Sequence, residues 1–262
     1  ELWRYRELFW FLAWRDILVR YKQTVIGIAW SVIRPVLTMA ILVVIFSRVA
    51  RLPSDGATPY SILVFTAMLP WQFFANALSE CSNSLISNSN VISKVFFPRL
   101  VVPVSSLMVS LVDFLIATVL LGILMAWHHF IPGWRIVMLP ILTLIMIATS
   151  LGPGIFLAAL NVKYRDFRYI VPFIVQFGLY LSPVGFSSSV VYQSATIPEW
   201  LKWVYGLNPM VGVIDGFRWA ILGGKSTINP ESFGVSIGVT LLMLMIGIMY
   251  FRKTERTFAD VM

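Results

Sequence analysis

Long stretches without charged residues divide this chain. Four contain no Asp, Glu, Lys or Arg, namely residues 56–79, 136–162, 169–198 and 232–251. Two more are interrupted once each, 25–47 by Arg34 and 100–127 by Asp113. A helix that crosses a bilayer needs about 20 mainly apolar residues, and runs of this length do not fit the roughly 10-residue strands of a barrel. The pattern predicts six transmembrane helices, near residues 25–48, 60–79, 101–127, 136–160, 169–187 and 233–251.

The composition supports an all-α integral membrane protein. Hydrophobic residues make up 58% of the chain and charged residues 12%, whereas soluble domains carry about 25% charged residues. A disulfide scaffold is excluded because Cys81 is the only cysteine. The formal net charge of +8 indicates cytoplasmic loops in contact with lipid headgroups, because basic residues of membrane proteins concentrate there. Membrane lipids are therefore expected partners, and nucleic acid is not.

The distribution of Lys and Arg predicts the orientation. Six spans place both termini on one side of the membrane. That side would carry thirteen of the 20 Lys and Arg residues and the other side six, with Arg34 inside a span. The positive-inside rule then puts both termini in the cytoplasm, with residues 252–262 as a cytoplasmic tail.

Residues 1–22 precede the first predicted span and have an imperfect amphipathic pattern. Basic residues, Arg15 among them, share one side of the helical projection, and Arg20 follows near the end of the segment. The pattern favours a helix that lies along the cytoplasmic leaflet. A plain membrane anchor without a mechanical role is the alternative. The opposite arc is largely apolar and contains Trp10, Trp14, Ile17, Leu18 and Tyr21.

Residues 188–230, between the fifth and sixth predicted spans, mix helix breakers with aromatic residues. Repeated Gly and Pro interrupt a sequence that stays apolar. Broken backbone is tolerated at membrane depth only where it packs on protein or lines a watery path. We therefore expect short re-entrant helices on the outer side. The aromatic residues of this segment include Trp200, Trp203 and Tyr205.

Arg34 and Asp113 are the two charges inside predicted spans. An ionisable group in the bilayer core is costly and usually faces the bundle interior, a partner or water. The two side chains are predicted to pair within a subunit or to line one aqueous channel. In the alternative interpretation, Arg34 binds carbonyl groups freed by Pro35, and Asp113 caps a neighbouring helix.

No nucleotide, metal or catalytic site can be assembled from the sequence. The tail Gly223-Gly224-Lys225-Ser226-Thr227 suggests a phosphate-binding loop, but Trp219 stands where that motif requires a glycine. The only histidines, His128 and His129, have no accompanying cluster of Cys or carboxylate ligands. We expect the chain to bind no cofactor of its own.

Several motifs together resemble ABC-2 type permeases, most closely those of the polysaccharide-export branch that includes O-antigen, capsule and teichoic acid exporters. Residues 20–30, with Arg34-Pro35, resemble the family's approach to its first span. Residues 88–98 resemble its loop between spans two and three, and Tyr164-Arg165-Asp166 its turn before span five. Ser182-Pro183-Val184 and Asn208-Pro209 resemble its outer segment. The first motif includes Tyr21, Lys22, Gly27 and Trp30.

The resemblance implies that residues 1–262 form a single transmembrane domain of a bacterial inner-membrane exporter. It implies a homodimer with two copies of a separate cytoplasmic ATPase, which would hold ATP and Mg²⁺. A lipid-linked polysaccharide would pass through a channel at the dimer interface. Residues 1–22 would lie at the membrane interface, and the outer gate would contain Pro183, Trp200, Trp203, Tyr205, Asn208 and Pro209.

Residues 80–98 would couple the channel to the ATPase. From residue 82 to 97 the segment is polar with a small apolar ridge, which suits a groove on another protein. A plain solvated loop is the alternative. The residues expected to dock are Leu85, Ile86, Asn88, Val91, Ile92 and Lys94.

Aromatic residues at helical spacing are candidates for contact with sugar rings. Phe173, Phe177 and Tyr180 recur along the fifth predicted span, and Trp71 and Phe74 along the second. Aromatic faces accept the C–H faces of sugars. Ordinary packing or an interfacial aromatic belt is the alternative.

Three other functions compete with polysaccharide export. An ABC-2 exporter of a drug or small lipid would share the fold. A membrane-embedded lipid-linked sugar transferase would need an acidic cluster, but the twelve acidic residues are scattered. A secondary transporter would show more ionisable groups inside its spans, together with an inverted repeat.

Overall fold

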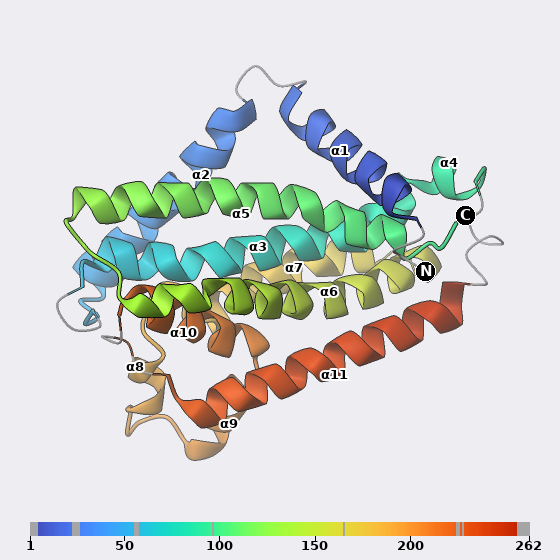
Figure 1. Ribbon diagram of the computed structural model, residues 1–262. Coiled ribbons are helices and arrows are strands. Elements are labelled where there is room, and N and C mark those ends of the chain that lie inside the picture. The colour runs from blue at the N-terminus through green and yellow to red at the C-terminus, as the bar shows by residue number, and fades with distance from the viewer. Residues whose placement is uncertain are drawn as a thin grey trace.

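The computed structural model describes residues 5–22, 27–54, 58–95, 97–164, 166–223, 226 and 228–255. Throughout these residues the regular secondary structure is helical, with no strand. The longer helices lie side by side as a bundle, and short helices gather near both of its ends (Figure 1).

The helices follow one another in a simple order. Two of them extend neighbouring α-helices, because η1 is a π-helical turn that continues α2 and η2 is a 3₁₀ turn that leads into α6. The elements are α1 (Arg6–Lys22), α2 (Gly27–Val43), η1 (Val44–Val49), α3 (Tyr60–Ser87), α4 (Ser89–Ile92), α5 (Val101–Trp127), η2 (Trp134–Met138), α6 (Leu139–Lys163), α7 (Phe167–Leu181), α8 (Ser189–Tyr192), α9 (Glu199–Gly206), α10 (Pro209–Ile221) and α11 (Pro230–Thr254).

Five helical segments of the described chain are long and apolar enough to cross a membrane. They are Ala29–Val49, Tyr60–Ser87, Val101–Trp127, Trp134–Lys163 and Pro230–Thr254. The fifth predicted span, 169–187, corresponds to the 15-residue helix α7, which is about 22 Å long at 1.5 Å per residue. Its helix ends at Leu181 because a residue before proline disfavours the α conformation, and Ser182 before Pro183 is extended.

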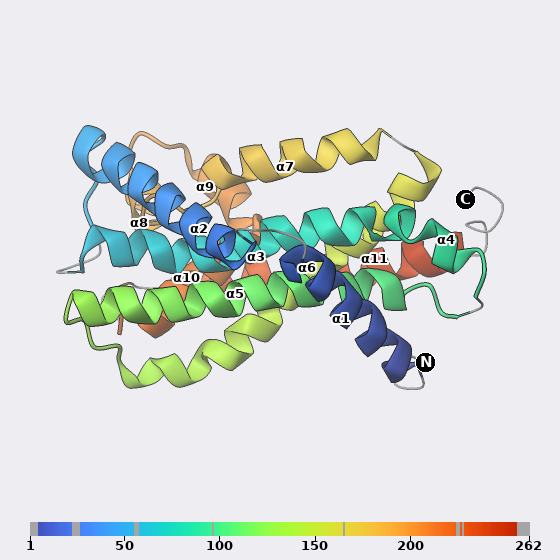
Figure 2. The ribbon, with the colours of Figure 1, turned by 90° about the horizontal axis from the view of Figure 1, so that it is seen from above.

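Helix α3 forms the centre of the bundle. Its residues from Ile62 to Trp71 are all buried, as expected for a helix that is apolar on every side. Figure 2 shows α7 on one side of α3 and α5 on the other, with α2 and α6 crossing the bundle at an angle. The main core joins α3 to α5, α6 and α10, and Phe114 of α5 contacts both Phe73 and Phe217.

Helices α6 and α11 approach closely at two glycines. A Cβ on Gly247 would lie 2.3 Å from the carbonyl oxygen of Gly152. The hydroxyl groups of Thr149 and Thr240 are 2.9 Å apart at the same interface. Small residues allow membrane helices to pack with their backbones in contact.

Both described ends of the chain lie at the same end of the bundle. Leu12 of α1 and Phe251 of α11 share a buried cluster with Ile92 of α4. The backbone N–H of Arg99, just before α5, donates to Oε1 of Glu255 at 2.9 Å. The structure therefore brings the two described ends together beside α4.

Candidate functional site

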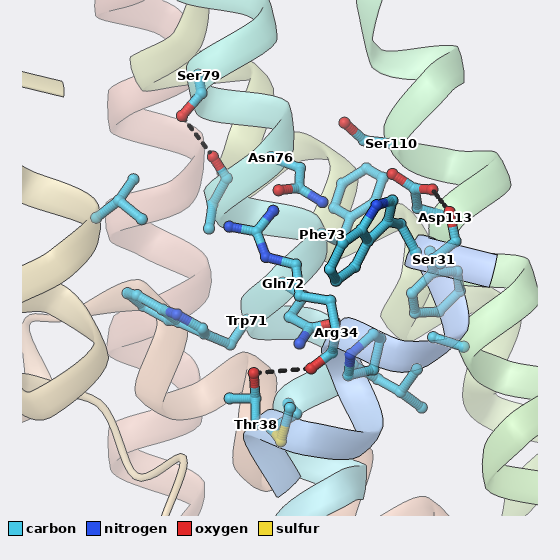
Figure 3. Close-up of a pocket in the computed structure, with 18 of the residues that line it drawn as sticks. Ser31, Arg34, Thr38, Trp71, Gln72, Phe73, Asn76, Ser79, Ser110 and Asp113 are labelled. Atoms are coloured by element: carbon cyan, nitrogen blue, oxygen red, sulfur yellow. Dashed lines mark hydrogen bonds between the residues drawn. The ribbon is translucent and has the colours of Figure 1, made fainter. Parts of the chain in front are cut away.

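A cavity of about 500 Å³ opens between α2, α3, α5 and α7. Its walls mix aromatic side chains with amides, hydroxyl groups and two arginines (Figure 3). Both charges predicted to share a channel, Arg34 and Asp113, line it. The remaining polar lining residues include Arg20, Tyr21, Ser31, Thr38, Gln72, Asn76, Ser79, Ser110 and Gln176.

Asp113 is held by the end of α1 and the start of α2. Its carboxylate pairs with Arg20 at 2.7 Å and accepts hydrogen bonds from Tyr21 at 2.5 Å and Ser31 at 3.1 Å. The predicted ion pair between Asp113 and Arg34 is therefore wrong. Sequence position could not show that the chain turns back between α1 and α2 and brings Arg20 to Asp113.

Arg20 and Tyr21 fasten α1 to the bundle. Arg20 also pairs with Glu80 of α3 at 3.2 Å, so that one guanidinium joins α1 to both α3 and α5. Partial burial and the hydrogen bond to Asp113 raise the pKa of Tyr21 to about 12. Tyr21 thus stays protonated and donates to the carboxylate at physiological pH. Arg20 and Tyr21, predicted as interface and family-motif residues, form part of the cavity wall.

Arg34 has a different environment. Its backbone carbonyl accepts a hydrogen bond from Thr38 at 2.9 Å, but within the described residues its guanidinium has no ion pair and no hydrogen bond. The alternative that Arg34 binds carbonyl groups freed by Pro35 is not supported. In Figure 3 the side chain extends from α2 toward α3, in the direction of Asn76.

The predicted coupling segment is partly buried by this chain itself. Leu85 lies in the last turn of α3 and is 0% exposed, and Ile92 in α4 is 7% exposed. Both fill the cluster that contains Leu12, so the prediction that they face a partner is wrong. Ile86 and Lys94 are exposed, and Val91 is half-buried.

Asn88, the remaining predicted coupling residue, connects this segment to α1. Its side chain donates to the carbonyl of Ser84 at 2.9 Å and accepts from Arg15 at 2.5 Å. Arg15 also pairs with Asp16 at 2.7 Å. The segment between α3 and α5 is thus joined by a side-chain hydrogen bond to α1, whose last turn lines the cavity.

Helix α1 turns its two tryptophans away from the bundle. Trp10 is 59% exposed and Trp14 63% exposed, whereas Leu12 and Ala13 are buried. Phe9 and Tyr21 of the same helix differ, because Phe9 packs against the cluster that contains Leu12 and Tyr21 lines the cavity.

Helix α7 presents a row of aromatic residues on its outer face. Phe173, Phe177 and Tyr180 are all more than half exposed, and the two phenylalanine rings lie 4.2 Å apart. On the opposite side, Gly178 allows α7 to approach Trp71, because a Cβ there would lie 2.7 Å from the indole. Trp71 lines the cavity, and its ring contacts Phe74 at 5.6 Å.

The predicted outer-gate residues fall into two groups. Pro183 is buried, and Asn208 joins its neighbourhood by donating to Ser182 at 2.9 Å. Asn208 also caps α10 by accepting from the N–H of Met210, directly after Pro209. By contrast, the remaining three lie on α9: Trp200 and Trp203 are exposed, and Tyr205 is half-buried.

The sequence analysis missed the role of Arg218. It is 0% exposed and donates to the carbonyl groups of Phe186 at 2.8 Å, Val184 at 3.3 Å and Leu63 at 3.4 Å. It thereby ties α10 to α3 and to the segment after α7. The available signal is a pair of charged residues, Asp215 and Arg218, in the otherwise apolar run after Asn208-Pro209.

Parts of the family motifs cannot be compared with the structure. Residues 23–26, Phe96 and Arg165 lie outside the described residues, as do Gly224, Lys225 and Thr227 of the tail that resembled a phosphate-binding loop. Lys22 is exposed at the end of α1, Trp30 lines the cavity, and Pro35 is buried two turns into α2, which begins at Gly27.

Comparison with known proteins identifies the architecture. The family model for ABC-2 type transporters matches residues 7–222. This chain belongs to the ABC-2 type transporter family. The ABC-2 match covers the cavity, the predicted coupling segment and residues 188–222 of the predicted outer segment, and the matched family is one of transporters.

Curated relatives of this chain include proteins named for O-antigen export and polysialic acid transport. The chain is 27% identical over 252 residues to an O-antigen export system permease protein RfbA of Klebsiella pneumoniae, covering 95% of this chain and 92% of the relative. It is 26% identical over 261 residues to the RfbA of Myxococcus xanthus, covering 99% and 97%. The polysialic acid transport protein KpsM of Escherichia coli is 24% identical over 252 residues, covering 92% and 91%.

Proposed function

We propose that this chain is the channel-forming transmembrane subunit of an ATP-driven exporter that moves lipid-linked polysaccharide across a bacterial inner membrane. Similarity over nearly the whole chain to permeases named for O-antigen and polysialic acid export carries this proposal. The polar and aromatic cavity supports it, because sugars combine hydroxyl groups with apolar C–H faces.

Six crossings, with α7 as the fifth, account for the arrangement of the chain ends. After α7, the carbonyl of Gly185 accepts a hydrogen bond from Tyr60 at 2.7 Å, and Tyr60 begins α3. Helix α7 therefore runs toward the end of the bundle opposite α4. An even number of crossings agrees with the common cluster of Leu12 and Phe251. The excess of basic residues places that end in the cytoplasm, with α1 along the inner leaflet.

The exposed side of α2 and α7 is the proposed interface with a second copy. Trp30 and Leu37 of α2 and Phe173 and Tyr180 of α7 are more than half exposed there. Two copies joined along this side would enclose their cavities in one path. The aromatic row of α7 would then face sugar rings rather than lipid.

Two copies of a cytoplasmic ATPase would bind beside α4 and hold ATP and Mg²⁺. Ile86, Asn90, Lys94 and Val95 form the exposed surface available for docking. Movement of this surface would reach α1 through the hydrogen bond between Arg15 and Asn88. At the other end, α8, α9 and α10 would form the outer gate.

Deletion of the gene tests this function. The expected result is accumulation of one lipid-linked glycan on the cytoplasmic face, relieved by expression of this chain together with its ATPase. Normal surface glycan in the deletion strain would contradict the proposal. Accumulation of a drug or a small lipid instead would favour the other type of ABC-2 exporter.

A further inference from the structure

Four hydrogen-bonding side chains without partners converge on the cavity. They come from three helices: Arg34 from α2, Gln72 and Asn76 from α3, and Gln176 from α7. Across the described residues, no hydrogen bond or ion pair engages their side-chain polar atoms. Such groups are costly at membrane depth unless a ligand or water satisfies them.

The geometry makes these groups one cluster. Gln72 and Asn76 are four residues apart on α3 and therefore project from the same face. Arg34 extends toward that face from α2 (Figure 3). The α5 wall adds Ser110, whose buried hydroxyl also has no partner within the described chain.

The charge of the cavity is not balanced around Arg34. Its charged lining consists of Arg20, Arg34 and Asp113. The Asp113 carboxylate is already bound by Arg20, Tyr21 and Ser31. The Arg34 guanidinium thus remains as an unneutralised cation among neutral amides, which are suited to an anion that arrives from outside the chain.

The chemistry of arginine limits the class of anion that would bind in the cavity. A guanidinium presents a rigid fork of N–H donors that matches the oxygens of a phosphate in a bidentate manner. We propose that Arg34, with Gln72, Asn76 and Gln176, binds the phosphate-class anion that links the exported glycan to its lipid. This inference rests on the proposed export function and names the group that the cavity recognises. Trp30 and Trp71 in the same wall supply apolar contacts beside it.

A binding titration of the purified full chain in a neutral maltoside detergent tests the site. Native mass spectrometry would follow geranylgeranyl diphosphate and, as the uncharged match, geranylgeraniol. We expect Arg34→Gln to weaken diphosphate binding by about tenfold or more, since a hydrogen bond to a charged group is lost. The affinity of Arg34→Lys for the diphosphate should lie between those of the wild type and Arg34→Gln. The affinity for the alcohol should be the same in all variants. Arg48→Gln is the control, because Arg48 is exposed on the same span outside the cavity.

Three results would overturn the site. The first is equal diphosphate binding by the wild type and Arg34→Gln, and the second is equal affinity of the wild type for the diphosphate and the alcohol. Stronger binding of a lipid-linked uronic acid than of the diphosphate would likewise overturn it in favour of a carboxylate site.

Competition with inorganic diphosphate shows whether the site binds the free anion or requires the anion to be linked to a lipid. If it displaces the lipid from the wild type, the free anion is sufficient; if it does not, the lipid-linked form is required, and either result supports an Arg34-dependent site. Unfolding midpoints of each variant show whether a loss reflects misfolding. The export function is tested separately by the deletion strain, whose glycan accumulation does not depend on Arg34 binding.

Discussion

Arg34 and Arg218 have opposite surroundings in this protein. Arg218, on the packed side of the bundle, is fully buried and donates to three carbonyl groups. Arg34, on the open side formed by α2 and α7, lines a cavity and binds nothing within the described residues. Both arginines interrupt apolar sequence. Arg218 is bonded within the fold and therefore has a structural role, whereas the guanidinium of Arg34 is available to a ligand.

The difference extends to the helices that carry them. On the packed side, α6 and α11 meet at Gly152 and Gly247, and α10 is buried along most of its length. On the open side, the apolar residues of α2 and α7 face outward. The packed side holds the fold together, and the open side is where substrate and a second copy would be accommodated.

Replacing Arg218 gives the largest expected effect on stability. Arg218→Met removes the side-chain donor that the carbonyl groups of Leu63, Val184 and Phe186 share, and we expect a loss of about 3–5 kcal/mol in the free energy of unfolding. Arg34→Met should change it by less than about 1 kcal/mol, because no internal bond is lost. Thermal unfolding in detergent measures both. Equal destabilisation by Arg218→Met and Arg34→Met would contradict the claim that only Arg218 is bonded within the fold.

Adding a methyl group at the α6–α11 contact has a smaller effect. A Cβ on Gly247 would meet the carbonyl oxygen of Gly152, so Gly247→Ala should cost about 1–3 kcal/mol through overpacking. Gly238→Ala on the same helix is the matched control, because nothing lies within 4 Å of a Cβ there. It should be neutral or slightly stabilising, since alanine favours helix more than glycine. Unfolding midpoints that fall equally for both would contradict close packing at Gly247.

The pairing of Asp113 is tested by double-mutant cycles. Arg20→Ala with Asp113→Ala should show a coupling energy of about 0.5–3 kcal/mol, as expected for residues in direct contact. Arg34→Ala with Asp113→Ala should be additive. The measurement is again unfolding in detergent, and a coupling that appears only with Arg34 would restore the pair predicted from the sequence.

The smallest effect concerns Tyr21. Its pKa in the folded protein is raised above 10, to about 12, because of burial and the hydrogen bond to Asp113. Folding therefore favours the protonated phenol, and this contribution to stability is complete below pH 10 and is lost as the pH rises through 12. The tyrosinate absorbance removed by Tyr21→Phe should titrate near pH 12 in the folded protein. A midpoint near pH 10 would show that the bond to Asp113 does not form in solution.

Hydrophobic runs predicted most of the fold, because crossing a bilayer imposes a length and an absence of charge that a sequence shows directly. The end of α3 was placed too early. Its last turns are polar, but the helix continues to Ser87. There the side chains donate to carbonyl groups of the preceding turn: Ser79 to Ala75, and Ser82 and Asn83 to Ser79.

The site was less predictable than the spans. Sequence identified Arg34 and Asp113 as exceptional, and both line the cavity. It could not choose the partner of Asp113, because the approach of Arg20 depends on how α1 folds back on α5. Nor could it show that Leu85 and Ile92 are used within the chain, since an apolar ridge looks the same whether this protein or a partner covers it.

The central claim is that the open side is the transport path, and labelling during export tests it most directly. Val175→Cys places one reactive thiol in the cavity, because the native Cys81 is buried. Leu115→Cys places one on the exposed face of α5 away from the cavity. In membranes that contain the chain and its ATPase, a bulky maleimide should stop ATP-dependent export by Val175→Cys and leave Leu115→Cys active. Unchanged export by fully labelled Val175→Cys would contradict a transport path along α2 and α7.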